Sequence, residues 1–173
     1  QERFELWRPR TPPRQYLSGE THLFMGRQVR LQVLDGDKPD VKLADDRLVV
    51  RVVEPSERVE VRGSVEAWYG AQARKVLRER YTQQQAVWRR HDIDPPRLIV
   101  RSLSNRWGSL TAAGNLVLNA DLVRASPHLI DYVIAHEVAH VKHADHGIEW
   151  RRLLERVIPD WRRRKRELEQ QLL

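Results

Sequence analysis

The chain contains 173 residues, enough for one well-packed domain with or without a small appendage. Apolar residues make up 40% and charged residues 32%, as in a globular protein, and no apolar run approaches the length needed to cross a bilayer. Because cysteine is absent, disulfides and thiolate metal sites are excluded, and any metal must be held by His, Asp or Glu. These features predict a cytoplasmic protein that makes no use of a membrane.

The chain carries a net charge of +7, with 31 Lys and Arg against 24 Asp and Glu. Most of these cations are arginines, which prefer bidentate contacts with carboxylate or phosphate groups. An anionic substrate or partner is therefore one interpretation of the excess, and a surface rich in ion pairs is the other. Charge alone does not separate the two.

Residues 1–62 predict a β-rich N-terminal module. The segment 1–15 is dense in Arg and Pro, which is typical of an extended arm. Short apolar runs separated by turn signals follow it and predict an antiparallel meander. These runs cover residues 22–25, 29–34, 48–53 and 59–61.

Residues 63–173 predict a second domain that combines helices with short strands. Ser64 is a candidate N-cap for a long helix that ends near His91. The further elements are strands at 98–100 and 116–118, a helix that begins at Ser126-Pro127, and a last helix from about Gly147. The helix after Ser126 is expected to bury a face made of Ile130, Val133, Ile134, Val138 and Val141.

The motif His136-Glu137-Val138-Ala139-His140 lies within the helix predicted after Ser126. Residues four apart differ by roughly 40° around a helix and by roughly 6 Å along it, so both imidazoles can reach one ion. Glu137 lies about 100° round the helix from His136, beside the ion, where a general base for water is needed. We therefore predict that His136 and His140 bind zinc and that Glu137 is the catalytic base.

Zinc needs a third protein ligand, for which several candidates follow the motif. His143 lies roughly 10.5 Å along the axis from His136, too far to share an ion if the helix persists, so a supporting or surface role is expected. His146 follows where the chain is expected to turn back toward the ion. Imidazole suits zinc, so His146 is favoured, and Asp145 and Glu149 are the carboxylate alternatives.

These motifs resemble those of the YgjP-like metal-dependent hydrolases, a metallopeptidase-like family similar to the SprT and wedge-loop metalloprotease groups. The resemblance covers most of the chain and rests on residues 105–109, 116–119 and 130–137 and on His146. It implies that His136, His140 and His146 bind zinc and that Glu137 is the catalytic base.

The order of elements and the resemblance together predict an α+β protein. We expect a zincin-like domain at residues 63–173, with the active-site helix packed on a small, mainly antiparallel sheet, preceded by the β-rich module at residues 1–62. The favoured function is zinc-dependent hydrolysis of peptide bonds.

Two other functions are alternatives to peptide hydrolysis. Some members of the resembled family are described as nucleotide pyrophosphatases, so the same zinc could serve hydrolysis of a nucleoside triphosphate. A nucleic-acid-associated module that acts on DNA-bound protein is the other alternative, with the basic run at residues 162–166 as its candidate contact. A solvated helix end is the competing interpretation of that run. The oligomeric state is not predicted.

Arg106 and Trp107 are candidate substrate-binding residues. In zincin-type folds a sheet edge lies above the metal, and an extended substrate can pair with that edge by strand addition. Arg106 could hold a substrate carboxylate or phosphate, or stabilise an oxyanion. In the alternative interpretation Arg106 pairs with a core carboxylate, Trp107 packs in the core and Gly108 forms a turn.

Overall fold

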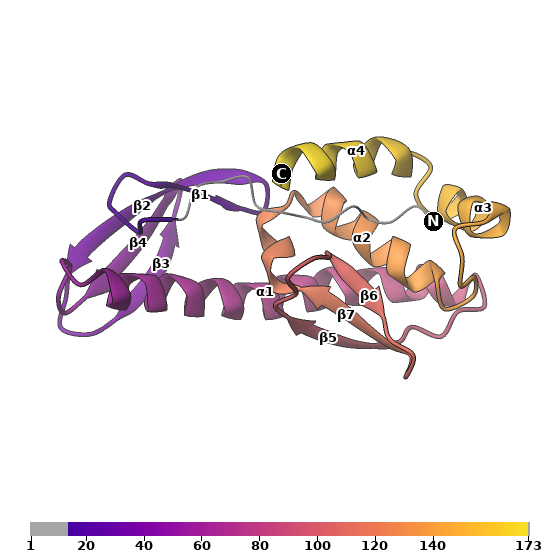
Figure 1. Cartoon of the computed structure of the whole chain (residues 1–173), viewed down its shortest axis with the longest axis horizontal. Helices are drawn as coiled ribbons and strands as arrows, with labels where there is room; N and C mark the ends of the chain where they lie inside the picture. Colours follow the sequence, from indigo (N-terminus) through magenta and orange to yellow (C-terminus); the bar gives the residue numbers. More distant parts are fainter. Residues whose placement is uncertain (1–13, 173) are drawn as a thin grey trace.

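The computed structural model describes residues 14–172 of the chain. Residues 1–13 of the predicted N-terminal arm lie outside the described residues. One long helix, α1 (Arg58–Arg89), contacts both β-sheets of the molecule (Figure 1). The predicted boundary between residues 62 and 63 lies inside this continuous helix, and the division into two domains stays a prediction.

The N-terminal sheet contains β1 (Thr21–Phe24), β2 (Arg27–Asp35), β3 (Asp40–Ala44) and β4 (Arg47–Val52) in the order β1-β2-β4-β3. The outer pairs are antiparallel, but β2 and β4 are parallel, so the predicted meander is wrong in its central pairing. The order follows from burial: Leu48, Val50 and Val52 of β4 are fully buried, whereas β3 is largely exposed and lies at the edge.

Helix α1 begins at Arg58, several residues before the predicted N-cap at Ser64. The strand predicted at residues 59–61 is therefore wrong. Its two β-branched valines favour a strand locally, but Val61 is fully buried as the first member of a stripe that recurs every four residues along the helix. The stripe comprises Val61, Val65, Tyr69, Ala73, Leu77 and Tyr81.

The second sheet contains β5 (Arg97–Arg101), β6 (Gly108–Leu110) and β7 (Asn115–Asn119) in the order β5-β7-β6. It is mixed rather than mainly antiparallel, because β7 runs parallel to β5 and antiparallel to β6. The loop at residues 102–107 carries the chain from β5 to the far edge, so β7 returns between the two. This topology leaves β6 as an edge strand beside α2 (Figure 1).

The 3₁₀ helix η1 (Ala120–Arg124), then α2 (Pro127–Ala139), α3 (Ile148–Val157) and α4 (Trp161–Leu172), complete the fold. The start of α3 after Gly147 agrees with the predicted last helix. This helix ends at Val157, before Pro159, and a separate helix, α4, follows it. Ile158 adopts an extended ψ of 87°, as expected for a residue that precedes proline. Within residues 14–172, no helix combines the length and the apolar character that a bilayer crossing requires.

The architecture is α+β, as predicted, with α2 packed against the second sheet and enclosed by α1, α3 and α4. A bidentate ion pair fixes α2 on α1: Arg80 donates through Nε at 2.9 Å and through Nη2 to the two carboxylate oxygens of Asp131. Gln84 Nε2 adds a third donor to Asp131 at 3.1 Å. These contacts hold the N-terminal part of α2 against α1.

Candidate metal centre

The motif lies on the most deeply enclosed helix of the molecule. Every residue of α2 from Tyr132 to Ala139 is buried, and among them His136 and Glu137, which can carry a charge near neutral pH, are each 6% exposed. A helix that is apolar on nearly all sides suits such a position. Burying ionisable groups is costly unless they are paired or coordinate a metal, so their presence here indicates a functional site.

The end of α2 presents His140 to the site. The helix ends at Ala139 with His140 as its C-cap, so Val141, predicted on the buried face, lies outside the helix and is 43% exposed. His140 Nδ1 donates a hydrogen bond to the backbone carbonyl of His143 at 3.0 Å. This hydrogen bond places a proton on Nδ1, which in the neutral tautomer leaves Nε2 of His140 as the atom that can bind a metal. His143 thus supports the site through its main chain.

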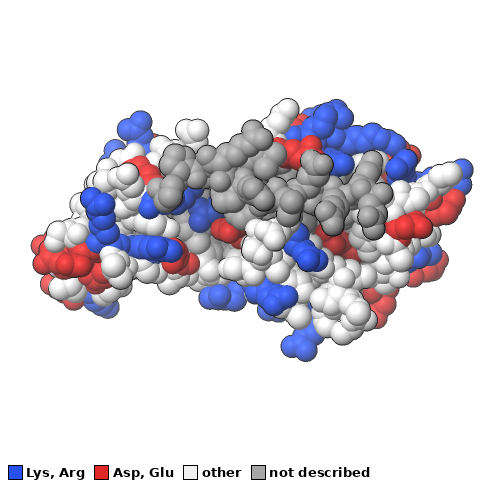
Figure 2. Space-filling model, viewed as in Figure 1, with Lys and Arg blue, Asp and Glu red and all other residues white. Residues whose placement is uncertain are grey.

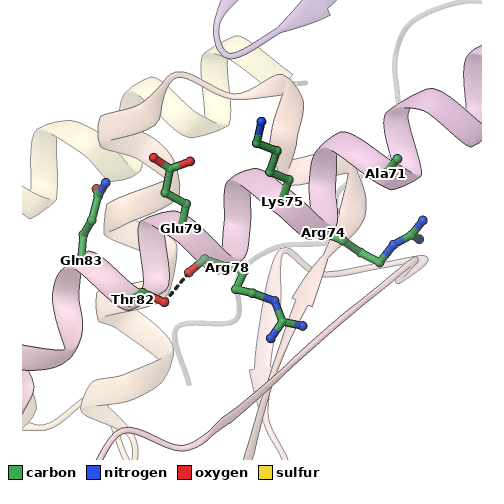
Figure 3. A pocket seen from close by; sticks show the side chains of 7 residues that line it. All are labelled: Ala71, Arg74, Lys75, Arg78, Glu79, Thr82 and Gln83. Carbon is green, nitrogen blue, oxygen red and sulfur yellow. Dashed lines mark hydrogen bonds between the residues drawn. The ribbon is translucent and has the colours of Figure 1, made fainter.

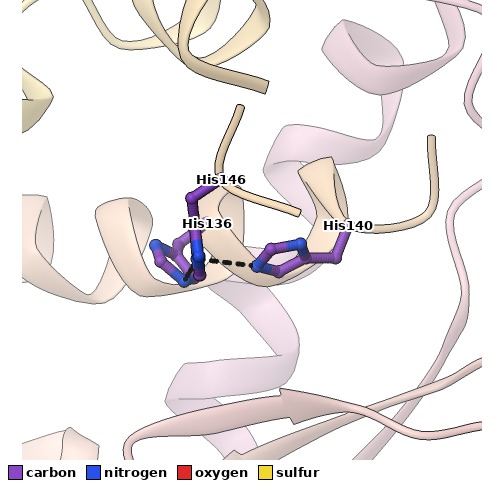
Figure 4. Close-up of side chains that lie close together, drawn as sticks. All are labelled: His136, His140 and His146. Carbon is purple, nitrogen blue, oxygen red and sulfur yellow. Dashed lines mark hydrogen bonds between the residues drawn. The ribbon is translucent and has the colours of Figure 1, made fainter. Parts of the chain in front are cut away.

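The chain then turns back and brings His146 to the two histidines of the motif. His146 Nε2 lies 3.1 Å from Nε2 of His140 and 3.1 Å from Nε2 of His136 (Figure 4). The three candidate ligand atoms all lie within 4.8 Å of one another. One ring nitrogen from each of His136, His140 and His146 can therefore reach the same metal ion.

The two carboxylate alternatives make other contacts. Asp145 Oδ1 accepts a hydrogen bond from the backbone N–H of Gly147 at 2.9 Å, which shapes the turn. Glu149 forms an ion pair with Arg152 on the exposed side of α3. Neither belongs to the group of converging ligand atoms.

The ring of Trp150 packs against all three imidazoles, a contact that the sequence did not predict. Its ring centroid lies 4.9, 5.6 and 4.6 Å from those of His136, His140 and His146, respectively. Trp150 is 1% exposed and projects from the first turn of α3. Its position three residues after Gly147, at the start of the helix that follows the turn, is the one sequence signal that relates it to the site.

The electrostatics of the site favour the neutral form of His136. Burial lowers the pKa of His136 well below 6.5, and the nearby His140 and His146 lower it further. Metal ions bind the neutral form of histidine. Three imidazoles with converging nitrogens form a donor set suited to a divalent cation.

Glu137 lies on the side of α2 that faces β6. A Cβ atom at Gly108 would lie 2.7 Å from Glu137 Cγ, so only glycine lets the strand approach the carboxylate this closely. Burial raises the pKa of Glu137 to about 7, against the opposing effects of a hydrogen bond from the Leu110 backbone and the charge of Arg106. Gly108 is thus the first residue of β6 rather than part of a turn.

The two candidate substrate-binding residues differ in exposure. Trp107 is 7% exposed, so only a small part of its ring can meet a substrate. Arg106 is exposed and donates from Nη1 to Ser109 Oγ at 3.3 Å. In residues 14–172 it forms no ion pair with a carboxylate, contrary to the alternative interpretation.

The basic run at residues 162–166 lies on α4, far from the edge of β6 in the fold (Figure 1). Arg162 pairs with Glu155, and both Arg163 and Arg164 pair with Asp160. Figure 2 shows acidic side chains among the basic ones on this part of the surface. Ion pairing within the protein thus accounts for three of the five cations in the run.

A hollow of about 600 Å³ follows one face of α1 (Figure 3). Its lining comes from that helix alone: Ala71, Arg74, Lys75, Arg78, Glu79, Thr82 and Gln83. Thr82 Oγ1 donates back to the Arg78 carbonyl at 2.9 Å, so this hydroxyl is engaged within the helix. None of the three histidines lines the hollow, and it is separate from the metal centre.

Comparison with known proteins identifies the family of the chain. The family model of the YgjP-like, metallopeptidase domain matches residues 1–171. A solved structure of the metallopeptidase zymogen jannalysin from Methanocaldococcus jannaschii is 18% identical, with a TM-score of 0.46, over 58% of this chain and 97% of that one. No curated protein matches the chain. Since the family model matches nearly its full length, the chain belongs to the YgjP-like metallopeptidase domain family.

Proposed function

We propose that the chain is a zinc-dependent peptidase in which His136, His140 and His146 hold the metal and Glu137 is the catalytic base. The observation that carries the proposal is the convergence of three ring nitrogens at the end of α2 beside a buried carboxylate. Membership of a metallopeptidase family supports a peptide as the substrate. The cytoplasmic location stays a prediction.

Zinc fits the donor set. Nitrogen ligands about 2.0–2.1 Å from a tetrahedral zinc lie roughly 3.3 Å from one another. His146 Nε2 lies 3.1 Å from each of the other two Nε2 atoms, close to that separation. Three protein ligands leave a fourth coordination position, which is the arrangement of catalytic rather than structural zinc sites.

The bound metal would supply Lewis acidity, which acidifies water and polarises the scissile carbonyl. The carboxylate of Glu137 accepts a proton from the attacking water as the new carbon–oxygen bond forms. It then donates this proton to the amine nitrogen as the carbon–nitrogen bond breaks. Burial, which raises the pKa of this carboxyl group, favours its holding the proton until the amine leaves. The Leu110 N–H and the close backbone of Gly108 hold the carboxylate in place for both proton transfers.

The edge strand β6 offers a place for the substrate backbone. β6 pairs with β7 on one side and with no strand of the described chain on the other. An extended peptide can add to such an edge through main-chain hydrogen bonds. Because Gly108 and Leu110 of this strand touch Glu137, a peptide added there passes beside the catalytic base.

The test compares the full chain with its Glu137→Gln variant, both loaded with zinc. We expect the parent to contain one zinc per chain and to cleave casein or quenched peptides in a chelator-sensitive manner. The variant is expected to keep zinc and lose about 10³-fold or more in turnover, because the proton acceptor is removed. Peptide cleavage that survives in Glu137→Gln, or a protein that binds no zinc, would contradict the proposal.

The nucleotide and nucleic-acid alternatives stay predictions. Assays of the same two proteins with nucleoside triphosphates and with DNA distinguish them. Release of phosphate or pyrophosphate that depends on Glu137, without cleavage of peptides, would replace the proposed reaction with phosphoanhydride hydrolysis. Binding of DNA without turnover that depends on Glu137 would favour the nucleic-acid module.

A further inference from the structure

A polar hollow of about 210 Å³ lies on the second sheet near the loop at residues 102–107. Two arginines, three hydroxyl groups and an amide line it, together with two aliphatic side chains, and no acidic residue is among them. The polar members are Arg101, Ser104, Asn105, Arg106, Ser109 and Thr111. The composition makes the hollow cationic and rich in hydrogen-bond donors.

Within residues 14–172, neither arginine of the hollow forms an ion pair with a carboxylate. In the described part of the chain, no ion pair involves Arg101 or Arg106, and the one hydrogen bond from Arg106 goes to Ser109. On α4, by contrast, Arg162, Arg163 and Arg164 all have carboxylate partners. Two arginines that line one hollow without a carboxylate partner form a site for an anion supplied from outside.

Strand geometry connects the hollow to the edge strand. Side chains alternate between the two faces of a strand. The face of β6 at Gly108 meets Glu137, so Ser109 points to the opposite, outer face of the sheet. Ser109 pairs in register with Val117 of β7, which also lines the hollow. The hollow therefore lies on the outer face, next to the free edge of β6.

A peptide added to this edge presents its side chains alternately to the metal face and to the outer face. A substrate residue opposite Ser109 on the outer face lies beside Arg106 and the hollow. We propose, on the basis of the peptidase function proposed above, that Arg101 and Arg106 bind a carboxylate of the peptide substrate and so set a preference for an anionic residue at this position. The carboxylate belongs to an acidic side chain or to the C-terminus of the peptide.

Binding to a full-length, zinc-loaded Glu137→Gln protein tests this without turnover. Fluorescently labelled peptides that carry a single Glu at successive positions are compared with the same peptides carrying Gln, by anisotropy. At one position we expect the Glu peptide to bind about tenfold more tightly, because a charge-assisted contact is lost in the Gln peptide. The Arg101→Gln/Arg106→Gln double variant is expected to bind both peptides equally.

The matched control is Arg97→Gln. Arg97 is an exposed arginine at the other end of β5 and does not line the hollow. This variant removes the same charge and should keep the preference for Glu. Zinc content measured on each variant verifies that the metal centre has folded.

A second pair of peptides separates the two sources of the carboxylate. Peptides that end at the selected position carry Gln there with either a free or an amidated C-terminus. Tighter binding of the free acid, lost in the double variant, identifies a terminal carboxylate. Preference for internal Glu alone identifies an acidic side chain.

Equal or absent binding of Glu and Gln peptides at every position would overturn the assignment of the hollow. So would a preference that survives in the double variant, or binding of nucleoside triphosphates in place of Glu peptides. Cleavage of peptides by the parent protein without any Glu preference would leave the peptidase function intact. Binding dependent on Glu without cleavage by the parent would contradict the peptidase function and leave the hollow as a peptide site.

Discussion

Two buried histidines, one in each half of the molecule, have opposite surroundings. His22 of β1 is fully buried between Arg14 and Arg124, and neither of its ring nitrogens has a hydrogen-bond partner among residues 14–172. His136 of α2 is 6% exposed, and the ring of His146 lies against it with the Nε2 atoms 3.1 Å apart. Burial lowers the pKa of both. Burial alone therefore favours a neutral histidine, whereas a candidate metal site also needs the converging ligand atoms of other residues.

The largest effect is expected from removing one of the three converging histidine nitrogens. His146→Ala removes one of three nitrogens and is expected to weaken zinc binding roughly 10²- to 10³-fold, measured by competition with a chromogenic chelator. His143→Ala is the matched control in the same turn, because the contact with His140 comes from the backbone carbonyl of residue 143. Zinc affinity that falls equally in both variants would contradict the assignment of His146.

The second effect concerns the isolated histidine. Burial, together with the charges of Arg14 and Arg124, lowers the pKa of His22 to about 3. The unfolded chain takes up a proton near pH 6.5 whereas the folded chain does not until about pH 3, so the contribution of His22 to stability is present above pH 6.5 and is lost as the pH falls. Between pH 7 and pH 4 this loss is about 3 kcal/mol.

Replacing His22 by leucine should remove this pH dependence. The free energy of unfolding is measured with urea at pH 7 and at pH 4. Its decrease between the two pH values should be about 3 kcal/mol smaller in His22→Leu than in the parent. The carboxylate of Glu20, 3.9 Å from His22 Nε2, is present in both proteins. Identical pH profiles for the two proteins would show that His22 is already charged or solvated in the fold.

A third change tests the contact between β6 and the base. Gly108→Ala places a Cβ 2.7 Å from Glu137 Cγ, so the carboxylate or the strand must move. We expect turnover to fall roughly 10- to 100-fold with zinc retained, since small displacements of catalytic groups are costly. Gly63→Ala is the control, because its Cβ meets nothing within 4 Å in α1, and it should leave turnover intact. Full activity in Gly108→Ala would show that the close approach is not needed.

The smallest effect concerns the attachment of α2 to α1. Asp131→Asn weakens the bidentate pair with Arg80, in which both side chains are partly exposed, and should lower the free energy of unfolding by about 1 kcal/mol. Glu66→Gln weakens the more exposed pair with Arg62 and is expected to leave the free energy of unfolding nearly unchanged. If both variants behave alike in urea unfolding, the pair does not anchor the metal-bearing helix.

Local sequence features were sufficient to predict the elements whose formation depends only on residues close together in the chain. The helix after Ser126, with Ser126 as its N-cap and Pro127 in its first turn, was predicted from its cap and apolar spacing. The convergence of His136 and His140 follows from four-residue spacing on one helix. The turn back at His146 was signalled by the residues that end the helix. In each case the interacting groups are separated by ten residues or fewer.

Features that depend on distant contacts were not predictable in this way. The parallel pairing of β2 with β4, the helical state of Val61 and the mixed second sheet were each decided by which strand or stripe could be buried. The same holds for three features of the site, each of which involves residues from separate segments of the chain. They are the approach of Gly108 to Glu137, the packing of Trp150 against the histidines, and the cationic hollow.

The sequence by itself determined the ligand types, their spacing on α2 and the family of the protein, because short-range helix geometry and composition are local properties. Only the tertiary structure decided how deeply Glu137 is buried, what shifts its pKa and which arginines lack carboxylate partners. Burial and charge pairing depend on all segments that pack around a group, and those segments meet only when the chain has folded.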